Sequence, residues 1–402
     1  MKNYCCRHAL HHPLHHPLQK RLQTASRSSL QKGRTLMMVV VGAAALVTTQ
    51  GVIAEEMAHE HHEHMEHQEH ATHAGQGPHG THLHHQHGKG GFMFELRYMR
   101  MDMDGLLDGT ENVDTKDISG ARMGPVKDPR FPYMMAPTKM TMDMLMAMAM
   151  YGFTDRLTGM VMLNYLSNDM DMVMHMYMPT GMPMGDMKGS MDTSGIGDTR
   201  IGAMYTVNKN FTGTLGLSLP TGSIDEKTDM VMTGTSVTGA AMRSENLNIQ
   251  APYAMQLGSG TYDLIPSVTY KDESGDSGWG TQFEYTYRIG SNDNKYSLGD
   301  KAELTAWLVQ KAGNHLHVTG RLDYMSWQSI DGQDPKLNPM MAPTSDPQAS
   351  GGQRLDVLLG LTGVFGGHRI GFEVGKPIYE DLNGPQMKTE WVYSLGYQFM
   401  MM

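Results

Sequence analysis

The stretch W-V-Y-S-L-G-Y-Q-F, residues 391–399, decides the fold class. Large apolar residues, four of them aromatic, occupy every second position from Trp391 to Phe399, and small or polar residues or Val392 lie between them. Successive side chains of a β-strand point to opposite faces, so this alternation predicts a strand with one apolar face and one small or polar face. The sheet to which it belongs therefore separates two chemically different surroundings.

A C-terminal strand that closes on an aromatic residue resembles the assembly signal of Gram-negative outer-membrane β-barrels. The resemblance implies that a lipid bilayer surrounds the fold, and that function lies in the lumen, the loops and the tails. In this chain Phe399 is followed by Met400, Met401 and Met402, whereas the pattern usually stops at the aromatic residue. We treat 400–402 as a C-terminal extension of a barrel that spans 91–399.

Residues 1–54 have the features of an export signal. Lys32 and Arg34 precede an apolar run at 36–47, and small residues precede Glu55. The run is shorter than the roughly 20 residues that a membrane-spanning helix needs. We expect cleavage after Ala54, which removes both cysteines of the chain and leaves a mature protein without a disulfide or thiolate.

The charge of the chain excludes one class of partner. The whole sequence has a formal net charge of −10, and all acidic residues lie after the expected signal. A mature chain this acidic is not expected to bind nucleic acid. The expected partners are the outer-membrane lipid bilayer and either metal ions or small hydrophobic solutes.

Segments of about ten residues with period-two alternation run from Gly91 to the end of the chain, separated by Gly, Asn and Asp. Thirteen candidate strands result: 92–103, 137–150, 157–166, 197–207, 211–219, 246–257, 261–271, 279–289, 300–310, 315–327, 353–365, 369–376 and 389–399. Single-chain bacterial barrels have even strand counts. We therefore expect an all-β, transmembrane antiparallel up-and-down barrel of about 12 strands, with 14 as the next count and the surplus strand between 261 and 327.

Four motifs carry a family resemblance: S-G-I-G-D at 194–198, L-S-L-P-T-G at 217–222, L-G-S-G-T-Y-D at 257–263 and Y-S-L-G-D at 296–300. Together they resemble the outer-membrane family of meta-pathway phenol-degradation proteins, often simply called transporters. The glycines permit tight turns, and Pro220 ends a strand. The resemblance implies transport of small hydrophobic or aromatic compounds and implies no catalytic residues.

Methionine is the compositional outlier, with 41 residues in 402. A run of six alternates from Met140 to Met150, and two orientations are open for it. If Asp143 avoids lipid by pointing inward, the methionines face lipid as apolar cover, and this is the orientation we expect. In the other orientation Leu145 and the alanines face lipid, and the methionines line the lumen.

A second methionine-rich stretch, 170–191, contains Asp, Pro and Gly, and we interpret it as an outer loop. Thioether sulfur is a soft ligand that selects Cu(I) and needs no deprotonation. The alternative is a loop folded inward as an apolar plug. The candidate ligands in this stretch are Met170, Met172, Met174, His175, Met176, Met178, Met182 and Met184.

Residues 55–90 are polar and rich in histidine, and we expect a disordered periplasmic tail there. Neutral imidazole binds Cu(II), Zn(II) and Ni(II), so the tail is a candidate metal-binding segment; the alternative is a solubilising linker. Its candidate ligands are His59, His61, His62, His64, His67, His70, His73, His79, His82, His84, His85 and His87.

No spacing in the chain supports a Ser-His-Asp set, a phosphate loop or an H-E-x-x-H site, so we expect no enzyme and no required cofactor. The leading hypothesis is a passive channel or binding barrel that handles copper, with bound Cu(I) or Cu(II) expected ahead of Zn or Ni. The rival hypothesis is transport of small hydrophobic or aromatic molecules, with methionine as a flexible lining.

Overall fold

The computed structural model describes residues 77–78, 87–119, 133–178 and 180–401, which all belong to one compact unit, Glu66–Met402. Strands make up most of them. Helix is limited there to α2 (Thr115–Ile118) and two 3-10 turns, η1 (Tyr253–Met255) and η2 (Pro343–Ser345). No helix in these ranges is long and apolar enough to cross a membrane. The expected export signal, 1–54, lies outside the described residues.

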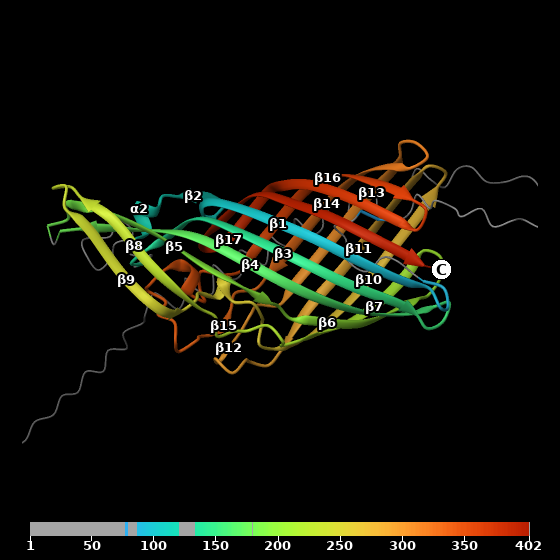
Figure 1. The fold of residues 1–402 in the computed structure, drawn as a ribbon, viewed down its shortest axis with the longest axis horizontal. Helices are drawn as coiled ribbons and strands as arrows, with labels where there is room; N and C mark the ends of the chain where they lie inside the picture. The colour runs from blue at the N-terminus through green and yellow to red at the C-terminus, as the bar shows by residue number, and fades with distance from the viewer. Residues whose placement is uncertain (1–76, 79–86, 120–132, 179, 402) are drawn as a thin grey trace, which may run out of the picture. The chain divides into compact units, whose positions relative to one another are not determined.

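Antiparallel strands close into a barrel (Figure 1). In order around the wall they are β1 (Phe92–Gly109), β17 (His368–Met401), β16 (Gly352–Phe365), β14 (Leu316–Trp327), β13 (Lys301–Lys311), β11 (Ser277–Ile289), β10 (Tyr262–Ser274), β7 (Phe211–Leu219), β6 (Thr199–Thr206), β4 (Leu157–Tyr177) and β3 (Ala136–Gly152). The ring closes because β3 pairs with both β4 and β1. Pairing satisfies the backbone groups on both sides of each strand, as a lipid-exposed wall requires.

The long element β17 forms the wall twice. Its first part pairs with β16, from Phe365↔His368 to Gly352↔Leu382, and its last part pairs with β1, from Leu107↔Gln386 to Phe92↔Met401. These two parts run in opposite directions and meet at Gly384, which has a positive φ of 80°. The eleven labelled elements therefore cross the wall twelve times, which agrees with the expected strand count and with the even parity of an antiparallel ring.

The surplus candidate strand is 246–257, so the expectation that it lay between 261 and 327 was wrong. Residues up to Gln250 belong to β9 (Ala241–Gln250), which pairs with β8 (Lys227–Ser236) and not with the barrel wall. Beyond Gln250 the chain turns through η1. Alternation alone predicted a strand at this position but could not reveal its partner.

A four-stranded extension continues from the barrel at one end (Figure 1). The distal half of β4 pairs with β5 (Pro183–Ile196), β5 pairs with β8, and β8 pairs with β9. The interpretation of 170–191 as a loop was therefore wrong, because most of this stretch is the β4–β5 hairpin. The Met-x-Met alternation persists there, with Asp169 and Asp171 exposed and Met170 and Met172 buried.

The two faces of the barrel wall differ as the alternation predicts. Apolar side chains point outward along neighbouring strands, among them Leu163, Leu215, Leu359 and Leu361, which are 51–65% exposed. The inward positions hold mostly buried polar, charged or methionine side chains. An apolar outer band around a polar interior is the arrangement of a transmembrane barrel.

The run from Met140 to Met150 points inward, so the expected lipid-facing orientation was wrong. Met140, Met146, Met148 and Met150 are at most 5% exposed, whereas Leu145 on the opposite face is 43% exposed. Asp143 lies on the outer face after all. It accepts a hydrogen bond of 2.5 Å from the Tyr98 hydroxyl and lies 3.7 Å from Arg100, and these partners offset the cost that the expectation assumed.

Part of the segment expected as a disordered tail is described and buried. Gly77 and Pro78 are buried, and the Gly77 carbonyl accepts a hydrogen bond from the Arg369 guanidinium of β17. His87 is 6% exposed, and its backbone amide lies 3.4 Å from the Thr158 hydroxyl of β4. The chain therefore contacts the barrel before β1 begins.

Candidate functional site

Three connections between wall strands pack against one another next to the extension. They bring together Tyr253 of η1, Tyr296 of the short strand β12 (Tyr296–Ser297), and Ile330 and Leu337 of the 328–351 connection. The two tyrosine rings meet edge to face with centroids 4.8 Å apart. Burial raises the pKa of both hydroxyls, so these side chains are uncharged.

A cavity of about 470 Å³ lies between these connections and the barrel wall. Its size is within the range of pockets that hold small organic ligands, about 300–1,000 Å³. Its apolar lining comprises Met101, Met103, Met140, Met142, Met387, Tyr253, Ala254, Leu298, Trp327, Ile330, Pro343, Ala349, Leu382 and Pro385. The cavity is thus walled mainly by thioethers on one side and by loop side chains on the other.

Alternation within β1 and β3 explains the thioether side. Met101 pairs with Met142 across the two strands, and Met103 pairs with Met140. Directly opposed residues of antiparallel strands have their Cβ atoms about 4.5–5.5 Å apart, so the four side chains form one continuous patch. Methionine adapts to irregular shapes and makes favourable contacts with aromatic rings, which suits a variable apolar ligand.

Polar and charged side chains also line this cavity, among them Arg354, Lys301 and Glu380. Arg354 of β16 donates a hydrogen bond of 2.9 Å to the Thr389 hydroxyl, and the same nitrogen lies 3.7 Å from the Met101 sulfur. Its Nε lies 3.1 Å from Asp356, so the guanidinium charge is paired. The cavity therefore offers an orienting edge without an unpaired cation at this position.

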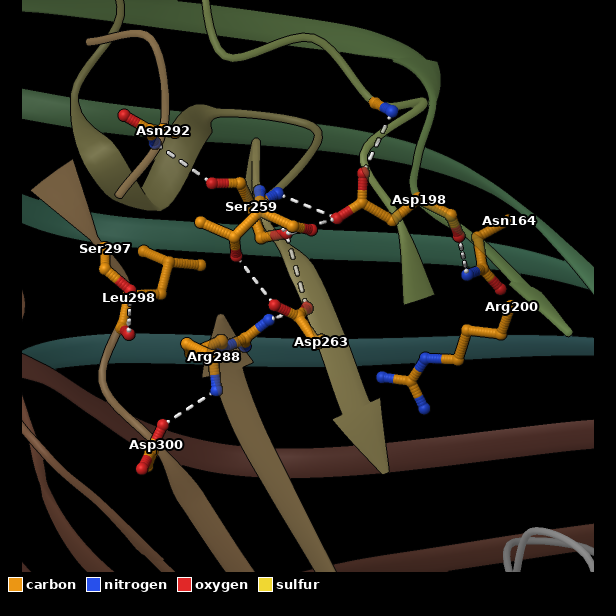
Figure 2. Close-up of polar contacts among 12 residues, drawn as sticks. Asn164, Asp198, Arg200, Ser259, Asp263, Arg288, Asn292, Ser297, Leu298 and Asp300 are labelled. Atoms are coloured by element: carbon orange, nitrogen blue, oxygen red, sulfur yellow. Dashed lines mark hydrogen bonds and ion pairs between the residues drawn. The ribbon is translucent and has the colours of Figure 1, made fainter. Parts of the chain in front are cut away.

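A polar network lies beside the cavity (Figure 2). The Ser259 backbone amide and hydroxyl both donate to Asp198 at 2.8 Å, and the Gly222 amide donates to the other oxygen of Asp198 at 2.9 Å. Asp263 accepts from Thr261 at 2.6 Å and is paired with the Arg288 guanidinium. A smaller cavity of about 220 Å³ adjoins these residues.

The network unites the four sequence motifs. Asp198, Gly222 and Ser259 come from three of them, and the fourth supplies Asp300, which accepts from the Arg288 backbone amide at 2.9 Å and from the Tyr285 hydroxyl at 2.9 Å. The carboxylates hold the ends of neighbouring strands and connections together. The motifs thus position the cavity wall, a role that sequence analysis missed because it ascribed them to turns.

The candidate metal ligands lie in different parts of the structure. Met170 and Met172 are buried in a large methionine cluster, and Met174 and Met176 pack against it. Met178, Met182 and Met184 lie at the tip of the β4–β5 hairpin, where Met182 is 57% exposed. Of the tail histidines only His87 is described, and the others, His59 to His85, lie outside the described residues.

His175 is buried with both ring nitrogens engaged. Its Nδ1 lies 2.7 Å from Asp186 across the hairpin, and its Nε2 lies 3.0 Å from the Thr115 hydroxyl of α2. Its contacts fasten the extension to the β1–β3 connection. Within the described ranges, no three His, Cys, Asp or Glu side chains are grouped so that they could hold a metal ion.

No family model matches the chain, and no curated protein matches it. Among solved structures it is similar to an outer membrane channel from Pseudomonas putida F1, with 13% identity over 78% of this chain and 97% of that one and a TM-score of 0.48. It is similar to the P. putida toluene transporter TodX (11%, 78% and 91%, 0.45) and to the Ralstonia pickettii toluene transporter TbuX (8%, 79% and 90%, 0.43). At these identities and TM-scores, nothing about the function of this chain follows from the similarity.

Proposed function

We propose that this protein is an outer-membrane channel for small hydrophobic or aromatic molecules, and that the 470 Å³ cavity is their binding site. The observation that carries the proposal is the lining itself. Thioethers, Trp327 and aliphatic side chains form much of the lining of a space of suitable size, and most of the polar side chains there are hydrogen-bonded or ion-paired. Burial of apolar ligand surface in such a cavity is favourable at about 25 cal/mol per Å².

The lining also discriminates between the two hypotheses of the sequence analysis. The copper-handling hypothesis combines loop sulfur with tail imidazole at one mouth of the pore, whereas hydrocarbon transport requires an apolar lining with aromatic residues. No described histidine lines the cavity, and Trp327 and Tyr253 do. Transport of hydrophobic solutes is therefore the function that we favour, and a copper-handling tail remains a prediction about residues that are not described.

We place the barrel in the outer membrane of a Gram-negative bacterium, with the N-terminal tail on the periplasmic side. The outward apolar band and the closed antiparallel ring support the membrane location. A periplasmic tail is consistent with export, since both ends of an even-stranded barrel lie on one side. We propose no catalytic activity and no nucleic-acid partner.

Binding and uptake of toluene test the proposal. The purified full chain in detergent is titrated with toluene by calorimetry, and uptake is measured in a Gram-negative host that lacks its own hydrocarbon channels. Ala254→Trp should fill the cavity, because Ala254 lines it from η1 and is exposed, so the fold tolerates a larger side chain.

Ala240→Trp is the matched control, because Ala240 is exposed in the β8–β9 connection and does not line the cavity. We expect wild type and Ala240→Trp to bind toluene and admit it, and Ala254→Trp to lose both properties. Equal toluene binding by all three proteins would show that the cavity is not the binding site. Absence of toluene uptake with the wild-type protein would contradict the channel function.

A further inference from the structure

Four methionines form one row across four adjacent strands. Met103 of β1 pairs with Met140 of β3, Met140 pairs with Met170 of β4, and Met170 pairs with Met191 of β5. All four are at most 8% exposed and belong to one buried cluster. We call these four residues the methionine row.

The geometry of the row allows its sulfur atoms to converge. Directly opposed positions have Cβ atoms about 4.5–5.5 Å apart, and methionine has three rotatable side-chain bonds. Further methionines surround the row in the same cluster, including Met172, Met187, Met230, Met232 and Met255. Neighbouring thioethers can therefore turn towards a common point without movement of the backbone.

Packing alone does not explain the choice of residue. On β3 every inward position from Met140 to Met150 is methionine, whereas the outward apolar positions of β1, β3 and β4 hold other residues, such as Phe94, Leu145 and Leu163. The same strands thus use aliphatic and aromatic residues against the surroundings and thioethers inside. This segregation points to a use for sulfur itself.

We propose that the methionine row binds a soft monovalent cation, Cu(I) or Ag(I), through two or three adjacent thioether sulfurs. Soft thioether ligands select such ions over harder ones, and they bind without losing a proton. Met103 and Met140 also line the 470 Å³ cavity, so an ion that enters the cavity can contact two side chains of the row directly. Of this ligand set the sequence analysis had named only Met170, because the pairing of β1, β3, β4 and β5 becomes visible only in the fold.

A second buried methionine cluster, which we call the lower cluster, provides an internal control. Met93, Met146, Met148 and Met162 are likewise buried, but the void that adjoins the last three has only about 10 Å³. Leucine is similar to methionine in volume and is tolerated in its place, but it has no sulfur. Four Met→Leu changes in either cluster therefore remove the same number of thioethers with similar effects on packing.

The experiment measures Cu(I) bound per chain in competition with a chromophoric Cu(I) chelator, using the full chain in detergent. Copper X-ray absorption reports whether sulfur or nitrogen surrounds the ion. We expect M103L/M140L/M170L/M191L to bind one Cu(I) ion fewer than wild type. We also expect the X-ray absorption of its copper to lack the sulfur ligands seen in wild type. We expect M93L/M146L/M148L/M162L to match wild type, and the tail histidines contribute equally to all three proteins.

Unchanged Cu(I) binding in the row variant, or equal loss in both variants, would overturn the proposal. If the fourfold row variant does not fold, as judged by its heat-modifiable gel mobility, the pair M140L/M170L must show the same loss of one ion. Toluene titration of the same variants keeps the two proposals apart. Leucine leaves the cavity apolar, so loss of Cu(I) with retained toluene binding bears only on the metal site.

Discussion

The lumen has two walls built by the same alternation but from different chemistry. Along β1, β3 and β4 the inward side chains are mostly methionines, which form two buried clusters. Along β14, β16 and β17 several of them are charged and paired: Arg321 lies 3.1 Å from Asp323 and 3.3 Å from Glu373. Both walls fill the interior with nearly unexposed side chains, yet one depends on dispersion and the other on charge pairing.

The difference has a mechanical consequence. A buried ion pair has one good geometry, and each partner is costly if it is left alone. A methionine wall has many arrangements of similar energy, because thioethers are flexible and polarisable. We infer that the charged wall fixes the shape of the lumen and the methionine wall accommodates what enters it.

The largest expected effect breaks the charged wall. Arg321→Ala leaves Asp323 and Glu373 buried without their cation, and both side chains are at most 11% exposed. Removing one partner of a buried pair typically costs about 3–5 kcal/mol of unfolding free energy. Urea unfolding of the full chain in detergent, followed by tryptophan emission, measures the loss.

The control for this change removes the orphaned charges as well. Arg321→Met combined with Asp323→Asn and Glu373→Gln should recover much of the lost stability, because no uncompensated charge remains. If the triple variant is as unstable as Arg321→Ala, packing around Arg321 and not charge pairing stabilises this wall.

The next effect introduces polarity into the methionine wall at the cavity. Met142→Gln keeps a side chain of similar length but places an amide against the ligand. When toluene binds, this amide loses its hydrogen bonds to water and gains no new partner, which costs about 1–3 kcal/mol. The binding free energy of toluene should therefore be weaker by about that amount. Calorimetric titration of Met142→Gln beside Met142→Leu checks it, and equal affinities would indicate that toluene does not contact this wall.

A smaller effect is expected within the lower cluster. Met148 and Met162 face each other across β3 and β4 and are 5% and 2% exposed. Changing both to leucine conserves volume, and each change should cost less than about 1.5 kcal/mol. Urea unfolding of the single and double variants measures this, and a loss as large as that of Arg321→Ala would remove the contrast between the walls.

The sequence predicted the strands well where local alternation determines them. The β7 range, Phe211–Leu219, matches the expected one, and both passes of β17 were anticipated at 369–376 and 389–399. What alternation cannot give is the partner of a strand or the face that points inward. The M-x-M pattern therefore left the orientation of 140–150 open, and the Asp, Pro and Gly residues within 170–191 favoured a loop there.

The candidate site was less accessible to sequence analysis, for the same reason. The cavity lining comes from β1, β3, β17 and other wall strands and from three distant connections, which only the closed ring brings together. Asp198, Ser259 and Asp300 belong to three of the four family motifs. Their acidic and hydroxyl side chains were the available signal for a hydrogen-bonded network. Their shared location depends on contacts between residues 41 to 102 positions apart in the chain, which no local pattern encodes.

The smallest expected effect concerns a charge pair in the connections outside the wall. Asp225 accepts a hydrogen bond of 2.7 Å from Asn294 and is paired with Lys336, and its side chain is 57% exposed. Asn294 and then Lys336 hold the pKa of Asp225 below its ordinary value. A carboxylate with a lowered pKa stabilises the fold above its ordinary pKa, and this stabilisation disappears as the pH falls through the lowered pKa.

Asp225→Asn should therefore cost at most about 1 kcal/mol at pH 7, because exposed pairs contribute little. The difference from wild type should vanish at a pH below the lowered pKa, where Asp225 is itself neutral. Thermal unfolding of both proteins across pH 3–7 measures it. A difference that persists in acid would mean that the Asn294 hydrogen bond depends on the carboxylate shape and not on its charge. Set against Arg321→Ala, this exposed pair shows how much less a charge pair contributes when water surrounds it, because Asp225 is 57% exposed and Glu373 is 2% exposed.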